Sequence, residues 1–343
     1  MVKELSVEEK LKLIKRNLDE IIGEEDLIKL LKEKKIPVIY WGTAPTGRPH
    51  IGYLFPALKW ADLLRAGCKV KILLADLHAA LDNVPWNVLE RRYDYYEKII
   101  PLLIQAIGGD TKNLIFIKGS EMQLKPEYMY DVLKISSLVS VHDAMKAASE
   151  VVKMGDNPKV SGLIYPLMQA IDEQYLGVDA QLGGTDQRKI MVLARENLPK
   201  IGYKARIELI NPLIPGLIGK KMSASDEKSK IDLLDDEKTV KEKLKNAECV
   251  SGNPDNGIMA FLKYVLMVIK TDKKEKFIVE RDKKYGGNLE YNSYEQIEKD
   301  FVAGKLHPLD LKNAVAKEIS KILLPIQKHK VELEKLSKLA YGK

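Results

Sequence analysis

Apolar residues follow two different periods along the chain, and the order of these periods indicates the fold. Short apolar runs at 36–41, 70–76, 114–119, 178–184 and 206–210 are typical of buried strands. Between them apolar residues recur at helical spacing, as in HIGYLFPALKWADLLRAG, which is expected to stop at Gly67. A strand, a helix and a strand within about 40 residues form a βαβ unit with parallel strands. The pattern therefore predicts an α/β fold built on a Rossmann-like, doubly wound parallel sheet.

Charged helical patterns flank this α/β segment on both sides. Residues 6–35 favour helices broken near Gly23, and the chain after about residue 232 keeps a helical period. Pro49 stands where the first helical position after the first strand is expected. The expected organisation is N-terminal helices at 1–35, a Rossmann-like domain at 36–218 with a helical insertion at about 120–160, a loop or linker at 219–232, and an all-helical domain at 233–343.

Composition excludes several classes of protein. The chain is 45% hydrophobic and 31% charged, as in soluble globular proteins, and its apolar runs are far too short to cross a bilayer. The first residues lack the order of a signal peptide, so we expect a cytoplasmic protein without membrane contact. Cys68 and Cys249 are far apart and lack metal-binding spacing, which indicates small buried side chains rather than a disulfide framework or a zinc site.

The positive charge is concentrated toward the C-terminal end. The net charge is +7, and residues 220–343 hold 26 Lys and Arg against 21 Asp and Glu. Such a bias suits contact with a polyanion such as RNA, although a solvated lysine-rich surface is the more common cause.

The stretch GTAPTGRPHIGY, residues 42–53, follows the first strand at the edge of the sheet where ligands bind in this architecture. It contains neither a dinucleotide-binding glycine motif nor a Walker loop. A turn between strand and helix still presents free N–H groups to an anion, and the helix dipole would keep His50 neutral and able to donate to a phosphate. Gly52 would allow a flat base to approach closely. The alternative is that His50 merely starts a helix and Gly52 merely packs.

A second motif favours the functional interpretation of His50 and Gly52 over the purely structural one. Residues 216–235, GLIGKKMSASDEKSKIDLLD, have the composition of a loop that leads into a lysine-rich helical region. Together, PHIGY and KMSAS resemble the HIGH and KMSKS signatures of class I aminoacyl-tRNA synthetases. The resemblance covers nearly the whole chain and is strongest to the tyrosyl-tRNA synthetase family of the archaeal and eukaryotic cytoplasmic branch. The matching blocks are YWGTAPTGRPHIGY, ILLADLHAALDN, LIYPLMQAIDEQYLGVDAQLGGTDQRKI, NPLIPGLIGKKMSAS, KYGGN and HPLDLKNAV.

Three polar residues in YPLMQAID would share one face of a helix that starts after Pro166: Tyr165, Gln169 and Asp172. A solvated helix face is the alternative. The resemblance implies that Tyr165 and Gln169 lie near the amino group of a bound tyrosine, and that Asp172 accepts a hydrogen bond from its phenolic hydroxyl. It further implies that the remaining pocket residues are Tyr40 as a second hydroxyl partner, Gln187 as a contact to the amino acid, and Leu73 and His78 as walls, although plain core packing would explain the last two.

The resemblance also implies a two-step reaction, in which ATP activates tyrosine to tyrosyl-adenylate and the tyrosyl group then passes to the 3′ end of tRNA(Tyr). The implied ATP-binding residues are Gly42, Thr43, Ala44, His50, Gly52, Gly184, Asp186, Lys221, Met222, Ser223 and Ala224, and the implied catalytic residues are His50, Gly52, Lys221, Ser223 and Ser225. Mg²⁺ would arrive with ATP, because no protein-only cage of carboxylates is evident.

Two positions depart from the signatures: Tyr53 replaces the second histidine of HIGH, and Ala224 replaces the second lysine of KMSKS. The missing cation must be replaced by Lys220, Lys221 or a metal ion, and we expect Lys221 to supply most of its effect.

In the C-terminal part, the resemblance implies an anticodon-binding domain. Tyr285 would stack on a base, Asp310 would bind the guanine at the first anticodon position with His307 nearby, and Arg188 would contact the acceptor stem. Tyr285 could instead be a core or turn aromatic, and Asp310 could be an ordinary helix N-cap. Residues 120–160 would form a homodimer contact, although a buried crossover helix would have the same pattern.

Three other functions remain open at this point. A tryptophanyl-tRNA synthetase would carry the same motifs, but Tyr40 and Asp172 suit a hydroxyl better than an indole. A small-molecule nucleotidyltransferase would not need the basic helical region, and a catalytically silent RNA-binding descendant would not need His50, Gly52, Asp172 and Lys221.

Overall fold

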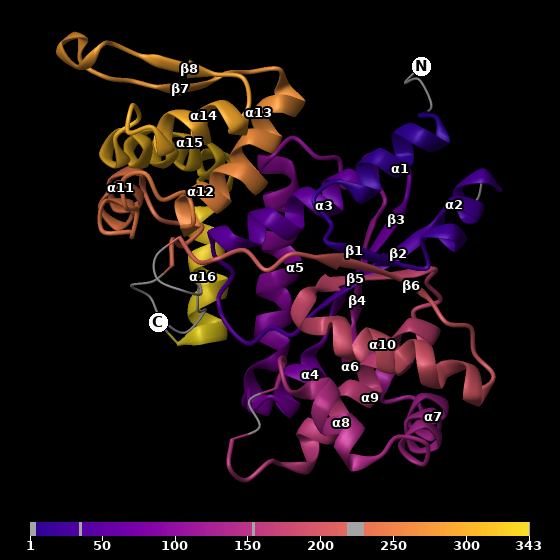
Figure 1. Cartoon of the computed structure of the whole chain (residues 1–343). Coiled ribbons are helices and arrows are strands. Elements are labelled where there is room, and N and C mark those ends of the chain that lie inside the picture. The colour runs from indigo at the N-terminus through magenta and orange to yellow at the C-terminus, as the bar shows by residue number, and fades with distance from the viewer. Residues whose placement is uncertain (1–4, 34–35, 153–154, 218–229, 343) are drawn as a thin grey trace.

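The computed structural model describes residues 5–33, 36–152, 155–217 and 230–342. It contains a larger part built on a six-stranded sheet and a C-terminal part that is mostly helical (Figure 1).

The sheet confirms the predicted α/β architecture. Its strand order is β1-β6-β5-β2-β3-β4, and every neighbouring pair is parallel except β1 with β6. The strands are β1 Glu20–Ile22, β2 Val38–Thr43, β3 Lys69–Leu74, β4 Leu114–Lys118, β5 Ala180–Gly184 and β6 Ile207–Asn211. The edge strand β1 lies where only helices were expected, because three residues are too few to reveal a strand period.

Alternate strand residues face two apolar cores on opposite sides of the sheet. Ile39 and Ile72 pack with α1, α2, α3 and α5, whereas Tyr40 and Leu73 pack with α7 to α10. The helices of this part are α1 Val7–Lys15, α2 Glu24–Lys32, α3 Leu54–Arg65, α4 Asp76–Leu81, α5 Leu89–Ala106, α6 Gly119–Gln123, α7 Pro126–Ser136, α8 Val141–Ala148, α9 Val160–Tyr175 and α10 Arg188–Asn197, with short turns η1 Ile51–Tyr53, η2 Trp86–Val88, η3 Thr185–Gln187 and η4 Leu198–Ile201.

The first crossover begins later than expected. Pro49 is not the first helical residue; His50 is the N-cap, with φ −134° and ψ −179°, and the helical turn starts at Ile51. The His50 side chain accepts a hydrogen bond from the Gly52 N–H, which satisfies one of the free amides at this end. Gly67, with φ +85°, follows the end of α3 as expected.

The C-terminal part is helical except for an antiparallel hairpin that the sequence pattern missed. Its elements are α11 Glu237–Lys245, α12 Gly257–Phe261, the π-helical turn η5 Leu262–Leu266, α13 Met267–Lys273, β7 Phe277–Val279, η6 Lys283–Tyr285, β8 Leu289–Tyr291, α14 Tyr294–Val302, α15 Pro308–Gln327 and α16 Lys330–Tyr341. The same apolar core that covers one face of the large sheet continues into these helices. The two parts therefore share one buried core.

Helix α16 returns to the larger part and lies along α5 (Figure 1). The Tyr341 hydroxyl donates to the Gly47 carbonyl oxygen at 3.1 Å, and the Tyr96 hydroxyl on α5 donates to the same oxygen at 2.6 Å. Arg92 donates to the Thr46 carbonyl oxygen at 2.5 Å and lies over the Tyr341 ring. The loop before His50 is thus held by both α5 and α16.

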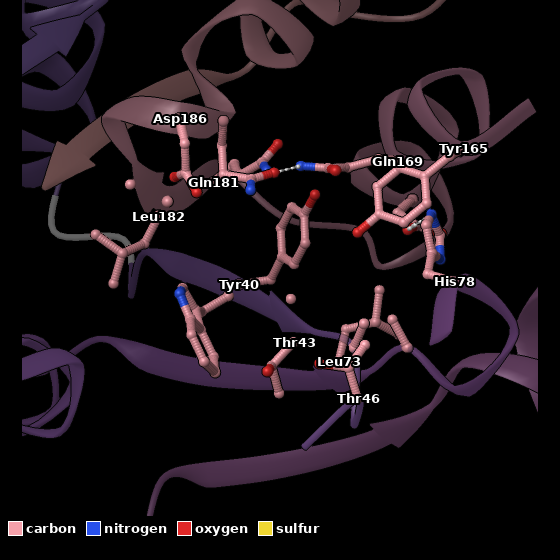
Figure 2. Close-up of a pocket in the computed structure, with 18 of the residues that line it drawn as sticks. Tyr40, Thr43, Thr46, Leu73, His78, Tyr165, Gln169, Gln181, Leu182 and Asp186 are labelled. Carbon is pink, nitrogen blue, oxygen red and sulfur yellow. Dashed lines mark hydrogen bonds and ion pairs between the residues drawn. The ribbon is translucent and has the colours of Figure 1, made fainter. Parts of the chain in front are cut away.

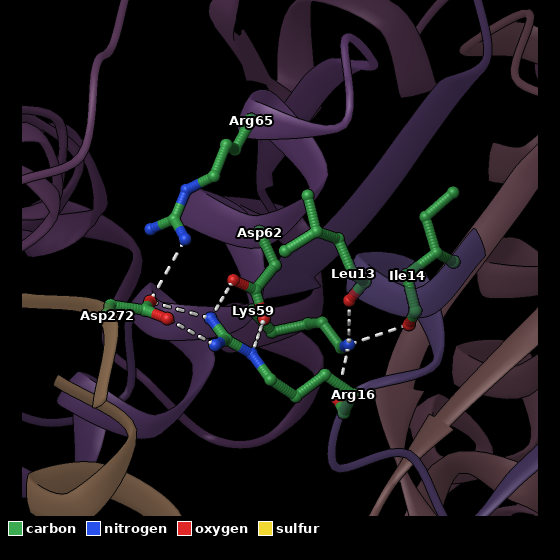
Figure 3. A network of polar contacts seen from close by, with 7 residues as sticks. All are labelled: Leu13, Ile14, Arg16, Lys59, Asp62, Arg65 and Asp272. Atoms are coloured by element: carbon green, nitrogen blue, oxygen red, sulfur yellow. Dashed lines mark hydrogen bonds and ion pairs between the residues drawn. The ribbon is translucent and has the colours of Figure 1, made fainter. Parts of the chain in front are cut away.

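Lys59 on α3 holds the end of α1. Lys59 is only 3% exposed. Its ammonium group donates to the carbonyl oxygens of Leu13, Ile14 and Arg16 at 3.3, 2.7 and 2.5 Å (Figure 3). These carbonyls lie at or just after the end of a helix, where carbonyl groups lose their helical partners, although the Leu13 oxygen also accepts from the Arg16 amide at 3.3 Å. Burial lowers the pKa of Lys59 to about 8.

The Arg16 side chain extends this contact to the C-terminal part. Its guanidinium group pairs with Asp62 on α3 and with Asp272 on α13, the latter at 2.7 Å (Figure 3). Arg65 pairs with the same Asp272 at 3.0 Å. One charged network therefore joins α1, α3 and α13.

Replacing Lys59 with methionine should lower the free energy of unfolding by about 1–3 kcal/mol, because buried carbonyl oxygens at the end of α1 lose their donor. Thermal and urea unfolding would measure the change. The matched control is Lys69→Met at an exposed lysine, which should alter stability little. Equal stability of both variants would contradict the capping role of Lys59.

Candidate active site

A cavity of about 480 Å³ opens at the carboxyl ends of β2 and β5, under helix α9 (Figure 2). This is the edge of the sheet that was predicted to bind a ligand. The neighbouring strands β2 and β5 lie at the point where the order of the parallel strands reverses. The lining residues are Tyr40, Trp41, Gly42, Thr43, Ala44, Thr46, Tyr53, Leu73, Ala75, His78, Tyr165, Gln169, Asp172, Gln181, Leu182, Gly183, Gly184, Asp186 and Gln187.

All seven residues expected around a tyrosine line this cavity. Tyr165, Gln169 and Asp172 share one face of α9, as predicted, but this helix begins at Val160 and contains Pro166 within it. The expected start after Pro166 was wrong, because the preceding residues continue the helix on its N-terminal side. The Gln169 amide donates to the Gln187 side-chain oxygen at 3.1 Å, which fixes both side chains (Figure 2).

The Tyr40 hydroxyl is buried at the end of β2 and has no hydrogen-bond partner within the described part of the chain. Burial, together with nearby carboxyl groups, raises the pKa of Tyr40, so the hydroxyl keeps its hydrogen. An unpaired buried hydroxyl is costly, and a polar group of a ligand would satisfy it.

The Asp172 carboxyl group is 1% exposed and belongs to α9. One oxygen accepts hydrogen bonds from Gln123 and Tyr128, each at 2.8 Å. Burial raises the pKa of Asp172 to about 7, and these two bonds act in the opposite direction. Gln123 and Tyr128 were missed by sequence reasoning, since neither belongs to a recognisable pattern.

Leu73 and His78 form part of the cavity wall. The His78 ring meets the Tyr165 ring edge-on with 4.5 Å between centroids. Burial lowers the pKa of His78 to about 4, so the ring is neutral near pH 7.

The residues expected near ATP divide between this cavity and a second one. Gly42, Thr43 and Ala44 at the end of β2, and Gly184 and Asp186 after β5, line the first cavity. A Cβ atom at Gly184 would lie 2.5 Å from an Asp186 carboxyl oxygen, so only glycine leaves Asp186 in place.

The second cavity, of about 260 Å³, shares Trp41, Tyr53 and Gly184 with the first. It contains the predicted His50 and Gly52, and the missed Phe261 of α12. The remaining lining residues are Phe55, Pro56, Asn211, Pro212, Leu213 and Ile214. An elongated ligand could therefore extend from the Asp172 cavity to the start of α3.

His50 is 9% exposed, and its Nδ1 accepts a hydrogen bond from the Gly52 amide at 3.2 Å. The hydrogen of the neutral ring is therefore on Nε2, which is free to donate. Burial, and then the nearby charge of Lys230, lowers the pKa of His50 to about 4. The predicted neutral state has a different cause from the helix dipole that was expected to produce it.

The KMSAS residues Lys221, Met222, Ser223, Ala224 and Ser225 lie outside the described residues. Residues 231 and 232, further along the chain, pair with the start of η1: the Ile51 amide donates to the Ile231 carbonyl oxygen at 2.9 Å, and His50 forms a β-bridge with Asp232. Arg48 adds an ion pair to Asp232 at 2.7 Å. The described chain from Ile231 to Asp232 is therefore anchored beside His50.

The residues expected to contact tRNA line neither cavity. Arg188 starts α10 and pairs with Glu20 at 2.6 Å. Tyr285 is 65% exposed in η6 between the hairpin strands, which agrees with the turn alternative. His307 is the N-cap of α15 and Asp310 is its third helical residue, so the alternative that Asp310 is the N-cap was wrong.

Comparison with known proteins now gives the family. The sequence matches the family described as class I tRNA synthetases (W and Y) over residues 32–324. The chain belongs to this family.

Several curated relatives are similar over nearly the whole chain. A cytoplasmic tyrosine–tRNA ligase of Danio rerio is 51% identical over 99% of this chain, which spans 64% of that relative's length. A cytoplasmic tyrosine–tRNA ligase of Saccharomyces cerevisiae is 48% identical. The matched region covers 92% of this chain and 82% of the yeast protein. The crystal structure of the tyrosyl-tRNA synthetase of Archaeoglobus fulgidus complexed with L-tyrosine is 41% identical, with a TM-score of 0.86 over 94% of this chain and 99% of its own.

Within the described part of the chain, no group of three His, Cys, Asp or Glu side chains is arranged to hold a metal ion. The helices in this part are all too short or too polar to span a membrane.

The His50 ring should be neutral at about pH 6, with its hydrogen on Nε2, because burial lowers the pKa to about 4. Nitrogen chemical shifts of ¹⁵N-labelled imidazoles would measure both properties, and His50→Gln would assign the signal. A doubly protonated His50 ring at that pH would contradict the buried environment.

Proposed function

We propose that the chain is a tyrosine–tRNA ligase, which activates L-tyrosine with ATP and then transfers the tyrosyl group to the 3′ end of tRNA(Tyr). The observation that carries this proposal is the pairing of two polar groups in one cavity: the unsatisfied Tyr40 hydroxyl and the buried Asp172 carboxyl group. The names of relatives such as the yeast enzyme support the same conclusion.

Tyrosine fits this cavity better than tryptophan or phenylalanine. Its hydroxyl can donate to the Asp172 carboxylate and accept from the Tyr40 hydroxyl, whereas an indole N–H can only donate and a phenyl ring can do neither. A buried polar site left unpaired by the wrong substrate penalises that substrate strongly. Tyr165, Gln169 and Gln187, which also line the cavity, would bind the amino acid's own polar groups.

In the first step the tyrosine carboxylate attacks the α-phosphate of ATP, and the bond to pyrophosphate breaks. The protein would contribute position and charge stabilisation rather than a covalent intermediate. Neutral His50 would donate from Nε2 to the phosphates, and Gly52 would lie under the adenine in the second cavity. Gly184 and Asp186 would lie near the ribose. Lys221, outside the described residues, would balance charge on pyrophosphate, and Mg²⁺ would enter as part of the ATP substrate.

In the second step a hydroxyl of the terminal tRNA ribose attacks the adenylate carbonyl, and AMP leaves. Arg188 would contact the acceptor stem, and the C-terminal part would bind the anticodon. The exposed Tyr285 ring offers a stacking platform, and the Asp310 carboxylate in the first turn of α15, close to His307, offers a hydrogen-bond acceptor for a base. We place this activity in the cytoplasm, in line with the relatives' names.

We also propose a homodimer formed through α7 and α8. Several large apolar side chains of these helices are exposed, including Tyr130 at 62%, Leu133 at 65% and Val141 at 63%. A buried crossover helix would not leave these side chains in water, whereas a dimer contact would bury them.

Asp172→Asn should reduce kcat/KM for tyrosine by roughly 10- to 100-fold in ATP–pyrophosphate exchange, because the hydroxyl loses a charged acceptor. The weak reaction with phenylalanine should change much less. Exchange with tyrosine, tryptophan and phenylalanine measures both effects, and Glu173→Gln, a buried carboxyl on the same helix outside the cavity, is the matched control. Wild-type exchange that tryptophan supports as well as tyrosine does would reject the proposed function.

Leu133→Asp should convert the dimer to a monomer, since a carboxylate would be buried in an apolar contact. Sedimentation equilibrium would measure the mass. Leu339→Asp, at an exposed leucine of α16, should leave the dimer unchanged. A wild-type monomer at micromolar concentration would overturn the dimer proposal without affecting the proposed reaction.

A further inference from the structure

The two oxygens of the Asp172 carboxyl group have different surroundings. Oδ1 accepts from the Gln123 amide at 2.8 Å and from the Tyr128 hydroxyl at 2.8 Å. Oδ2 accepts no hydrogen bond from the residues that the structure describes: the His78 Nε2 atom lies 3.9 Å away, which is too long for a hydrogen bond. Oδ2 is thus the oxygen left available to a ligand in the cavity that Asp172 lines.

The hydrogen positions on Gln123 and His78 follow from the same contacts. The Gln123 amide nitrogen lies 2.8 Å from Asp172 and 3.2 Å from His78 Nδ1, so its two hydrogens serve two acceptors. His78 therefore carries its own hydrogen on Nε2, on the side facing Asp172, and it is a neutral neighbour.

Tyr128 lies within hydrogen-bond distance of two acceptors but has one hydrogen. Its hydroxyl oxygen is 2.8 Å from Asp172 Oδ1 and 2.8 Å from the Met168 carbonyl oxygen. When Asp172 is ionised, Tyr128 can donate to the carboxylate. When Asp172 is protonated, the carboxylic acid can donate to Tyr128, which then donates to Met168. The position of one hydrogen is therefore coupled to the charge of Asp172.

Among the titratable groups that the described structure places around Asp172, no cation offsets its charge. These groups are His78 on α4, Tyr40 on β2, Tyr128 on α7, and Tyr165 and Glu173 on α9. The imidazole is neutral, and burial raises the pKa of the three phenols and of Glu173. The ionised form of Asp172 thus depends on the hydrogen bonds from Gln123 and Tyr128.

We propose that Tyr128 is a positioning residue for tyrosine specificity: by donating to Oδ1 it holds Asp172 as an ionised acceptor whose Oδ2 atom faces the substrate hydroxyl. This inference rests on the proposed function. Tyr128 is fully buried on the inner face of α7, so it acts through Asp172 and does not line the cavity itself.

The test compares Tyr128→Phe with wild type in tyrosine-dependent ATP–pyrophosphate exchange between about pH 5.5 and pH 9. In the wild type, kcat/KM for tyrosine should fall as the pH drops through about 7, where Asp172 becomes protonated. In Tyr128→Phe the carboxylate has lost a donor, so its pKa rises and the fall should begin at a pH about one unit higher.

At neutral pH, Tyr128→Phe should raise KM for tyrosine by roughly 10-fold or more while kcat changes little, because the lost interaction serves binding of the hydroxyl. Preference for tyrosine over phenylalanine should fall in parallel. The matched control is Tyr175→Phe, which removes a phenol from the same α7–α9 contact; Tyr175 donates to Asp131 at 2.9 Å and not to Asp172. This control should keep the wild-type pH profile.

Each result decides a separate point. A wild type without tyrosine-dependent exchange rejects the proposed function. An active wild type with the same KM and pH profile in Tyr128→Phe rejects the role of Tyr128 and leaves the function standing. If Tyr128→Phe fails to fold, Gln123→Met removes the other donor to Oδ1 in the same assay, and an unchanged profile there overturns the proposal.

Discussion

The burial of the Asp172 carboxyl group is the constraint on which the site depends. A carboxylate removed from water is stable only if donors replace its hydration. The chain supplies these donors from Gln123 and Tyr128 on two short helices, and it leaves one oxygen without a partner in the described structure. The helices between β4 and α9 thus serve the chemistry of the cavity as well as the apolar core.

Parallel strands explain why distant residues meet at this carboxyl group. Tyr40 pairs in register with Gln181 on β5, and the carboxyl ends of β2, β3 and β5 open at one edge of the sheet. The first crossover starts at the same edge, so the His50 ring and the Tyr40 hydroxyl belong to adjoining cavities. A ligand with an aromatic hydroxyl at one end and phosphates at the other matches this arrangement.

Much of the fold and of the site could be predicted because neighbouring residues in the sequence determine it. The strands β2 to β6 have clear apolar runs, and the spacing of Tyr165, Gln169 and Asp172 places them on one helix face. Strand β1 and the β7–β8 hairpin were missed because three-residue strands carry no period. Tyr128 and Phe261 were missed for another reason: their importance lies in contacts with residues far away in the sequence, which no local pattern records.

The contact between α16 and the loop before His50 has a consequence for how the molecule matures. The Gly47 carbonyl oxygen receives its bond from Tyr341, 294 residues further along the chain. While the ribosome is still synthesising the protein, that loop lacks one of its two hydroxyl donors even after the entire sheet has emerged. The loop before His50 therefore gains its last hydroxyl donor late in synthesis, after α16 has left the exit tunnel and docked.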